Sequence, residues 1–246
     1  IKTIGKEATD SILLSPRMTE QLKGISSPRI HIIPNFSEAF PSETEIAAKM
    51  ETFSTEPLQI LYLSNLIFSK GYSYLMAAVR SLRAKGIEVT LTLAGRPLDD
   101  EYMTAAEAKR RLDMELCEGI NFIGMVRGPE KWNQLLKAHV IALPTFYRTE
   151  AQPLSLIEGM AFGCIPLTTQ HNYNEDFLDP NAAIFVDKRS SESIEAAILD
   201  INNDRDASRS RAQLANSIAK NRFRLDQYIN DIDSVFMNAL NANHKI

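Results

Sequence analysis

The sequence predicts an α/β fold with a Rossmann-like parallel sheet and helices on both of its faces. Short apolar runs rich in β-forming side chains alternate along the chain with segments of helical periodicity, and this alternation is typical of parallel sheets covered on both faces. The chain has 246 residues, of which 44% are hydrophobic and 24% are charged. It is therefore long enough for one large domain with a core of its own.

Eight runs are the expected strands, because each is short, apolar and bounded by polar or turn-forming residues. They are Ile12–Ser15, Ile30–Pro34, Leu58–Ser64, Val89–Ala94, Ile120–Ile123, Val140–Leu143, Ile165–Thr168 and Ala183–Val186. Helical periodicity marks the segments Ser73–Lys85, Asp100–Glu118, Pro129–Ala138, Pro153–Phe162, Ser191–Ile201, Ala207–Lys220 and Leu225–Leu240. Residues 41–57 are expected to be a polar linker with room for a short helix.

Three of the expected helices have a distinct apolar face. The apolar face of the first consists of Leu75, Ala78, Val79 and Leu82, and the residues expected to point inward in the second are Tyr102, Ala105, Ala106 and Leu112. In the last helix Tyr228, Ile229, Ile232, Val235 and Phe236 form an apolar stripe. Part of this stripe is expected to be exposed without the partner domain, or buried by pairing between two copies. Ser11–Ser15 is interpreted as a short buried strand. A chain that opens on such a pattern without an initiating methionine is expected to be a fragment.

Composition and charge argue against several classes of protein. The net charge of −4 disfavours general nucleic-acid binding, which usually needs a basic surface, and the apolar runs are too short to span a bilayer. Cys117 and Cys164 are expected to be reduced and structural, as in the cytoplasm. The histidines have no metal-ligand spacing, and the glycine-rich nucleotide motifs are absent from the sequence. No metal site and no bound cofactor are expected.

The stretch Glu150–Glu158, E-A-Q-P-L-S-L-I-E, points most directly to a ligand site. It follows the expected strand Val140–Leu143 and opens the expected helix Pro153–Phe162, so both carboxylates are expected at the carboxyl edge of the sheet, where ligands bind. The free amide groups of Leu154 and Ser155 at the helix start favour an anion. Carboxylates beside them favour hydroxyl groups. A sugar attached to a nucleoside diphosphate supplies both.

Five motifs, in order, resemble those of the C-terminal half of a GT-B glycosyltransferase of family 4, over nearly the whole chain from about Ser11. Glu150–Ala161 is similar to the family's E-G-F-G-L-x-x-x-E-A-M-A, with both glutamates in place. Glu175 falls where the family has G-x-x-E. The other motifs are I-H-I-I-P-N-F-S-E at Ile30–Glu38, L-Y-L-S-N-L-I-F-S-K-G at Leu61–Gly71, L-T-L-A-G at Leu91–Gly95 and I-N-F-I-G-M-V at Ile120–Val126.

The resemblance implies that residues 41–222 form the domain that binds the nucleotide-sugar donor. Residues 1–40 are then expected to hold the end of the N-terminal, acceptor-binding domain and the interdomain junction, with the last strand and helix of that domain at Ile1–Gly24. Residues 223–246 are expected to form a helix that crosses back toward the N-terminal domain. Because the rest of that domain lies outside this sequence, the chain alone is expected to be inactive.

The resemblance also assigns roles to individual residues. Glu158 is expected to bind the ribose hydroxyls, and Glu150 the hydroxyls of the transferred sugar near the reaction centre. Lys70 is expected to pair with the diphosphate beside the amides of Leu154 and Ser155, so that no metal is needed. The residues alone leave simpler interpretations open: an exposed helix acid at Glu158, an acid near the helix dipole at Glu150 and a solvated lysine at Lys70.

Three positions depart from the family pattern. Asn65 stands where the family often has arginine, so it keeps a hydrogen-bond donor near the phosphates but loses the charge. Ser64 and Ala151 replace glycines. Arg96 is either a compensating charge or a surface loop residue.

The remaining candidates lie around the same expected edge of the sheet. Gly124, Met125 and Val126 end a strand and are expected to line the base pocket through backbone contacts. Glu175 is expected at the far rim, and the basic run at residues 109–111 is expected to be solvated. Three residues before the first glutamate either face the donor sugar or acceptor or pack in the core: Phe146, Tyr147 and Arg148.

The expected function is that of a retaining, metal-independent glycosyltransferase. It would move a sugar from a UDP-sugar or GDP-sugar to a saccharide or lipid-linked acceptor, in the cytoplasm or at the inner face of the membrane, with membrane contact only through the absent domain. One rival is a GT-B nucleotide-sugar epimerase. Another is a nucleotide-sugar-binding domain without turnover, which Asn65 and Ala151 favour and the retained acid pair disfavours.

Overall fold

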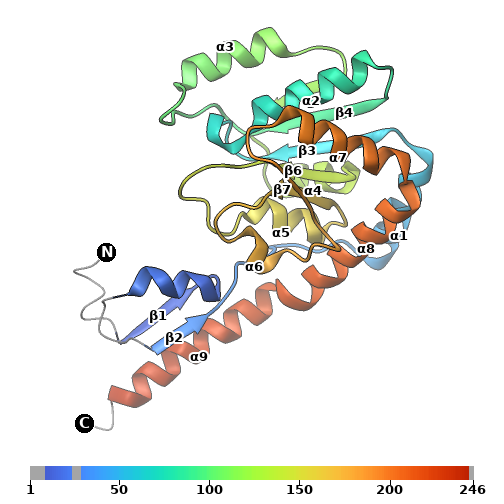
Figure 1. Ribbon diagram of the computed structural model, residues 1–246. Coiled ribbons are helices and arrows are strands. Elements are labelled where there is room, and N and C mark those ends of the chain that lie inside the picture. The colour runs from blue at the N-terminus through green and yellow to red at the C-terminus, as the bar shows by residue number, and fades with distance from the viewer. Residues whose placement is uncertain (1–8, 24–28, 244–246) are drawn as a thin grey trace.

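The computed structural model describes residues 9–23 and 29–243 of the chain. Its centre is a six-stranded parallel sheet with the order β5-β4-β3-β6-β7-β8 (Figure 1). The strands are β3 (Leu58–Leu63), β4 (Val89–Ala94), β5 (Ile120–Gly124), β6 (Val140–Leu143), β7 (Ile165–Thr169) and β8 (Ile184–Val186). These bounds confirm the expected parallel sheet, and β4 and β6 match their predicted bounds.

Helices cover both faces of this sheet. One face carries α2 (Tyr72–Ala84), which packs against α7 (Ser191–Asn203), and the other carries α5 (Leu154–Ala161), which packs against α8 (Arg205–Arg222). The remaining helices are α1 (Glu43–Thr55), α3 (Ala105–Glu115), α4 (Gly128–Lys137), α6 (Asn174–Phe177) and α9 (Leu225–Asn243). Side chains from both faces and from β3, β4 and β6 form one continuous apolar core.

The order of the strands creates a switch point between β3 and β6. From β3 the chain winds outward through β4 to β5, and from β6 it winds in the opposite direction through β7 to β8. The loops that follow β3 and β6 therefore diverge at the carboxyl edge of the sheet and leave room for a ligand between them.

The sequence-based prediction was wrong in two helical regions. Residues 41–57 are no linker, because Glu43–Thr55 is a full α-helix that starts with a capping box between Ser42 and Glu45. The helix α3 begins at Ala105 rather than Asp100, since the Asp100 carboxylate accepts the amides of the two residues that follow Glu101.

The inward face of α3 and of the segment before it also differs from the prediction. Tyr102 is 48% exposed, and Met103 is buried in its place. Ala106 is exposed and Ala105 is half-buried, whereas Leu112 is buried as expected. In α2 all four predicted residues are fully buried: Leu75, Ala78, Val79 and Leu82.

A second, two-stranded parallel sheet lies apart from the central one, alongside α9 (Figure 1). It consists of β1 (Asp10–Leu13) and β2 (Arg29–Ile32), with the 3-10 helix η2 (Pro16–Leu22) after β1. Contrary to expectation β1 is not buried, because Ile12 is 40% exposed. Residues 1–8 and 24–28 of the predicted N-terminal remnant lie outside the described residues.

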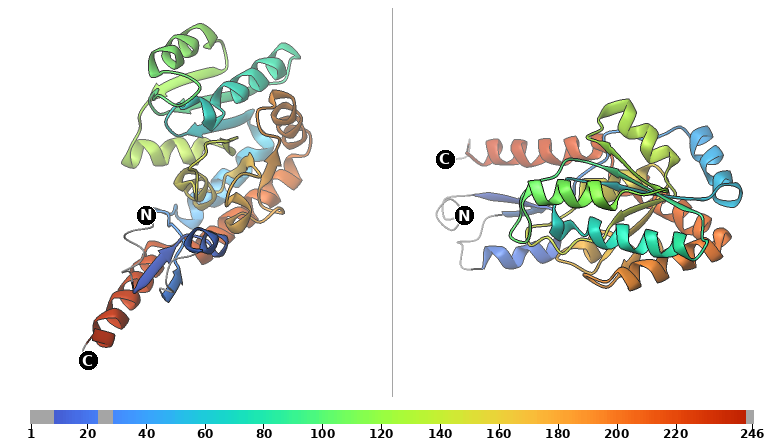
Figure 2. Two further views of the ribbon diagram at one scale, coloured as in Figure 1. Left: turned by 60° about the vertical axis from the view of Figure 1, so that its left-hand side comes forward. Right: turned by 90° about the horizontal axis from the view of Figure 1, so that it is seen from above.

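The last helix, α9, projects beyond the main body along this small sheet (Figure 2). Its apolar stripe is only partly covered: Tyr228 packs on Phe36 with ring centroids 4.5 Å apart and Val235 is buried, but Ile229 and Phe236 are 46% and 62% exposed. No helix in the described ranges is both long and apolar enough to cross a membrane.

Candidate functional site

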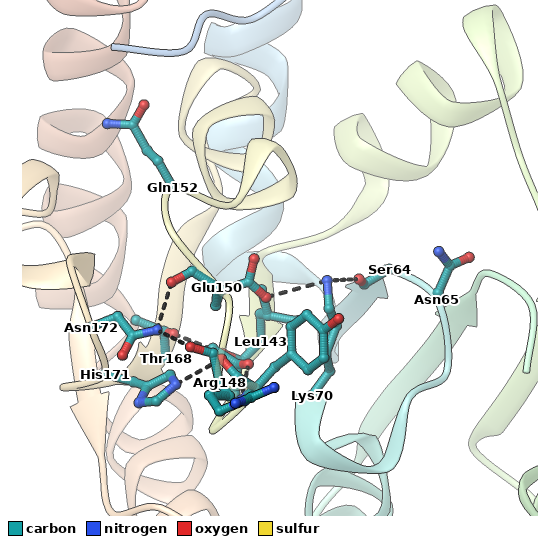
Figure 3. A network of polar contacts seen from close by, with 12 residues as sticks. Ser64, Asn65, Lys70, Leu143, Arg148, Glu150, Gln152, Thr168, His171 and Asn172 are labelled. Atoms are coloured by element: carbon teal, nitrogen blue, oxygen red, sulfur yellow. Dashed lines mark hydrogen bonds and ion pairs between the residues drawn. The ribbon is translucent and has the colours of Figure 1, made fainter. Parts of the chain in front are cut away.

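Lys70 and Glu150 meet at the switch point. The Lys70 ammonium lies 3.2 Å from Glu150 Oε2 and donates to Ser64 Oγ at 3.1 Å (Figure 3). The contact with Glu150 is an ion pair without hydrogen-bond alignment, so the buried Glu150 Oε2 receives no hydrogen bond from any of the described residues. Both side chains are mostly buried, with 16% and 11% of their surfaces exposed. The structure thus brings together two residues that the sequence assigned to one site.

Backbone geometry fixes the position of Lys70. It ends the 3-10 turn η3 (Phe68–Lys70), and Gly71 follows in the left-handed region with φ 83°. A Cβ at Gly71 would lie 2.2 Å from the Pro144 carbonyl oxygen, so the close approach of the two loops requires glycine. The Asp100 carboxylate accepts the Ser69 amide at 2.8 Å and holds the turn from the other side.

The loop that carries Glu150 is held by the loop after β7. His171 Nε2 lies 2.8 Å from the Tyr147 carbonyl oxygen, and Asn172 Nδ2 donates to the Arg148 and Glu150 carbonyls at 3.1 and 2.7 Å (Figure 3). Asn172 has φ 49°, a left-handed conformation that asparagine tolerates. These contacts orient Glu150 toward Lys70. The sequence analysis did not identify His171 or Asn172 as residues of the site.

The amino end of α5 presents free amide groups. Leu156 and Ile157 donate to the Pro153 carbonyl, and no side chain caps the helix. The amides of Leu154 and Ser155 precede the first intrahelical bonds, so they are available to an anion.

The loop before α5 is anchored to the predicted interdomain junction. The Asn35 amide donates to Gln152 Oε1 at 2.6 Å, and Asn35 Nδ2 donates to the Gln152 carbonyl at 2.9 Å. Gln152 is buried, with 6% of its surface exposed. The segment between the small and the central sheets therefore supports the start of α5 directly.

Glu158 has a lysine partner that the sequence analysis missed. Lys131 Nζ, on α4, lies 2.6 Å from Glu158 Oε1 and 3.5 Å from Glu38 Oε2. Glu158 is 9% exposed, so it is not the exposed helix acid that the residues alone left open. Gly159 brings α5 against β6, because a Cβ there would lie 2.3 Å from Ile141 Cγ2. The only signal for Lys131 in the sequence is a lysine in the first turn of an amphipathic helix, which is usually solvated.

The predicted base-pocket residues lie at the end of β5. Gly124 has φ 71° and its carbonyl accepts the Gly95 amide at 2.7 Å. Val126 is buried, whereas Met125 is 54% exposed. The Asn65 side chain lies beside Ser64, and Figure 3 shows no hydrogen bond or ion pair between it and Lys70 or Glu150.

Of the two aromatic residues before Glu150, Phe146 packs among other aromatic rings rather than facing the site. Phe146 is 8% exposed and lies about 6 Å from three other rings, with the Arg189 guanidinium 4.5 Å above its face. Those three rings are Phe68, Tyr74 and Tyr102. Tyr147 differs, since its ring centroid lies 5.5 Å from the Lys70 ammonium.

Other candidates remain at the surface. Arg96 and Glu175 are exposed, and the basic run at residues 109–111 is exposed as predicted. Both cysteines are free, as expected, with Cys164 buried and Cys117 exposed. Within the described residues, no group of three or more histidine, cysteine, aspartate or glutamate side chains is arranged to hold a metal ion.

Comparison with known proteins places the chain among enzymes that handle sugars. The family model described as "Glycosyl transferases group 1" matches residues 43–221. Glycogen synthase of Mycobacterium tuberculosis is 25% identical over 215 residues, which are 85% of this chain and 49% of that protein. The chain therefore spans about half the length of the curated relatives that it matches.

Solved structures share the fold at lower sequence identity. Sucrose-phosphate synthase from Thermosynechococcus elongatus superposes with a TM-score of 0.79 at 21% identity, over 98% of this chain and 61% of that one. HepE from Anabaena, in complex with UDP-glucose, superposes with a TM-score of 0.77 at 16% identity, over 96% and 66%. These matches confirm the predicted GT-B architecture.

Proposed function

Because the chain belongs to the glycosyl transferases group 1 family, we propose that it is the donor-binding half of a retaining, metal-independent glycosyltransferase. The enzyme would move a sugar from a nucleotide-diphosphate sugar to a polysaccharide or glycolipid acceptor. One observation carries the proposal: two lysine–carboxylate contacts, Lys70–Glu150 and Lys131–Glu158, flank the free amino end of α5.

In this proposal the diphosphate binds between Lys70 and the start of α5. The amides of Leu154 and Ser155 contact the distal phosphate, and the Lys70 ammonium turns from Glu150 to a phosphate oxygen. Charge-assisted hydrogen bonds of this kind contribute about 1.5–3 kcal/mol each. They stabilise the charge that develops on the leaving nucleoside diphosphate, so the lysine and the helix start take the place of a metal ion.

The two carboxylates would then bind hydroxyl groups on either side of the diphosphate. Glu150, released from Lys70, accepts hydroxyls of the sugar that is transferred. Glu158 lies one turn into α5 and accepts the ribose hydroxyls. The base continues toward Gly124 and Val126 at the end of β5. Bound UDP-glucose in the structurally similar HepE supports a uridine donor, and a guanosine donor remains the alternative.

The acceptor would be a saccharide or a lipid-linked saccharide bound by an N-terminal domain that faces this site. The length of the relatives supports this arrangement, since the chain matches about half of the curated glycogen synthase. We place the enzyme in the cytoplasm, with any membrane contact made by the N-terminal domain. On this proposal the chain alone binds the donor without transferring the sugar.

Calorimetry with UDP and GDP in the presence of EDTA tests the donor site. The chain is expected to bind one of them, and Lys70→Met is expected to weaken that binding by about tenfold or more. Lys137→Met, which removes an exposed lysine from α4, is the matched control and is expected to bind normally. Binding that requires Mg²⁺ or Mn²⁺ would contradict the metal-independent mechanism, and no binding at all would contradict the donor site.

A nucleotide-sugar-binding domain without turnover is the second candidate, favoured by Asn65 and Ala151 at positions where the family often has arginine and glycine. Donor incubated with the two-domain protein and an acceptor extract separates the possibilities. A glycosylated acceptor supports the transferase, an epimerised donor supports an epimerase, and unchanged donor supports the binding domain.

A further inference from the structure

Lys131 pairs with Glu158 in the candidate site, but the proposed function assigns it no part in binding the donor. We propose that Lys131 is a positioning residue for ribose recognition: it holds one oxygen of Glu158 so that the other faces the ribose hydroxyls. The inference rests on the proposed function, because it takes Glu158 as the ribose-binding carboxylate.

The contact between Lys131 and Glu158 is short and largely shielded from solvent. Lys131 Nζ lies 2.6 Å from Glu158 Oε1, and the two side chains are 16% and 12% exposed. Glu38, the second partner at 3.5 Å, has 65% of its side chain exposed, so it marks the solvent side of the contact. A partly buried charge pair is screened less by salt than a pair on the surface, so the attraction between Lys131 and Glu158 persists at physiological ionic strength.

Apolar side chains surround Glu158 on α5. Its neighbours on α5, Leu156, Ile157 and Met160, have no exposed surface and no polar side-chain group that donates a hydrogen bond. Within the described residues, Lys131 is the one side chain that donates to the Glu158 carboxylate. A buried carboxylate without such a partner is strongly destabilising, so the orientation of Glu158 depends on Lys131.

The Glu158 carboxylate keeps acceptor sites that Lys131 does not occupy. An ionised carboxylate has about four lone-pair sites on two oxygens, and Lys131 occupies a site on Oε1 alone. The Oε2 atom keeps its full capacity and is held still by the contact on the other oxygen. A hydroxyl that reaches Oε2 therefore meets an acceptor that is already ordered, which reduces the entropic cost of binding.

This role has a consequence that simple charge attraction lacks. If Lys131 orients Glu158, it strengthens binding only of ligands that carry ribose hydroxyls. If its charge merely attracts the diphosphate, it strengthens binding of every nucleoside diphosphate to the same degree. UDP and 2′,3′-dideoxy-UDP differ only in these hydroxyls and therefore separate the two roles.

The experiment measures the dissociation constants of UDP and 2′,3′-dideoxy-UDP by calorimetry for the wild type, Lys131→Met and Lys137→Met. The wild type is expected to prefer UDP by about tenfold or more, as for a hydrogen bond to a charged group. Lys131→Met is expected to lose most of this preference while its affinity for the dideoxy nucleotide stays within about twofold. Lys137→Met is expected to match the wild type.

Two further variants keep the test decisive if Lys131→Met is poorly folded. Lys131→Arg keeps a donor at this position and is expected to keep the preference for UDP. In a Glu158→Gln background, Lys131→Met removes the second member of the pair, so neither charge is left unpaired. This second change is expected to have no further effect on the preference.

Equal weakening of both nucleotides by Lys131→Met would overturn the positioning role, as would an unchanged preference for UDP. If the chain binds GDP in place of UDP, the same comparison is made with GDP and 2′,3′-dideoxy-GDP. A wild type that binds neither UDP nor GDP would overturn the donor site itself and the inference with it. A wild type that binds both equally would show that Glu158 does not contact the ribose.

Discussion

Lys70 Nζ lies 3.2 Å from Glu150 Oε2, and this contact joins the loop after β3 to the loop after β6. The two loops leave the sheet in opposite directions, so the contact spans the switch point at which α/β sheets bind ligands. In the absence of ligand the pair neutralises itself, and a diphosphate must compete with Glu150 for the lysine. Binding of the anion and release of the carboxylate are therefore coupled.

This coupling predicts that Glu150→Gln affects turnover more than affinity. The amide keeps the shape of the side chain but removes the negative charge near the reaction centre, and it leaves Lys70 free for the diphosphate. In the two-domain enzyme we expect kcat to fall by about 100-fold or more, while the affinity for UDP or GDP is unchanged or higher. Steady-state kinetics and calorimetry measure the two quantities, and a loss confined to nucleotide affinity would contradict the assignment.

Glu158→Ala is predicted to have the opposite effect. The ribose is held in both the ground state and the transition state, so its loss weakens uniform binding. We expect nucleotide affinity to fall by about 10- to 100-fold, with kcat at saturating donor close to that of the wild type. Thermal melting checks that the variant is folded. Wild-type affinity in this variant would remove Glu158 from the site.

Much of the fold was predictable because the central strands are short runs rich in apolar, β-forming residues. The strand β6 is apolar throughout, and β4 alternates apolar residues with threonine, and the structure reproduces the predicted limits of both. The helix α1 was missed because few of its side chains face the core, chiefly Ile46, Met50 and Phe53. Its capping box, Ser42 with Glu45, was nevertheless present in the sequence as a helix-start signal.

The residues of the candidate site were also predictable only in part. Glu150, Glu158 and Lys70 were predicted because they fall within motifs, and the structure brings Lys70 and Glu150 into contact. Lys131 and Asn172 were not predictable, since each acts through a contact with a residue distant in sequence. Such contacts depend on how α4 and the loop after β7 pack against α5 and the loop before it. No local pattern in the sequence encodes that packing.

The two cysteines are predicted to differ in reactivity. Cys164 is fully buried, and burial raises the pKa of its thiol, whereas Cys117 is exposed. Because the thiolate is the reactive form, we expect one equivalent of thiol to react with an aromatic disulfide reagent in the native protein and a second only after unfolding. Cys117→Ser is expected to abolish the native reaction, and two fast-reacting thiols would contradict the described packing.

His139 is buried in a network that fits only its neutral form. The Gln59 amide donates to His139 Nδ1 at 3.0 Å, so this nitrogen is an acceptor and carries no proton. His139 Nε2 then donates to Thr52 Oγ1 at 2.9 Å, and the Thr52 hydroxyl donates onward to the Lys49 carbonyl at 2.7 Å. Burial, followed by the charges of Arg205 and Lys49, lowers the pKa of His139 to about 3.

This low pKa predicts a loss of stability in mild acid. Between pH 3 and the unfolded value of 6.5, the unfolded chain binds a proton at His139 that the folded chain does not, so the free energy of unfolding falls as the pH decreases below about 6.5. The slope from this residue is about 1.4 kcal/mol per pH unit. Urea denaturation of the wild type and of His139→Gln between pH 4.5 and pH 8 measures it. The variant is expected to be less stable at pH 8, because it loses the buried ring, but to depend less on pH by about one proton. Parallel pH profiles for the two proteins would show that folding does not lower the pKa of His139.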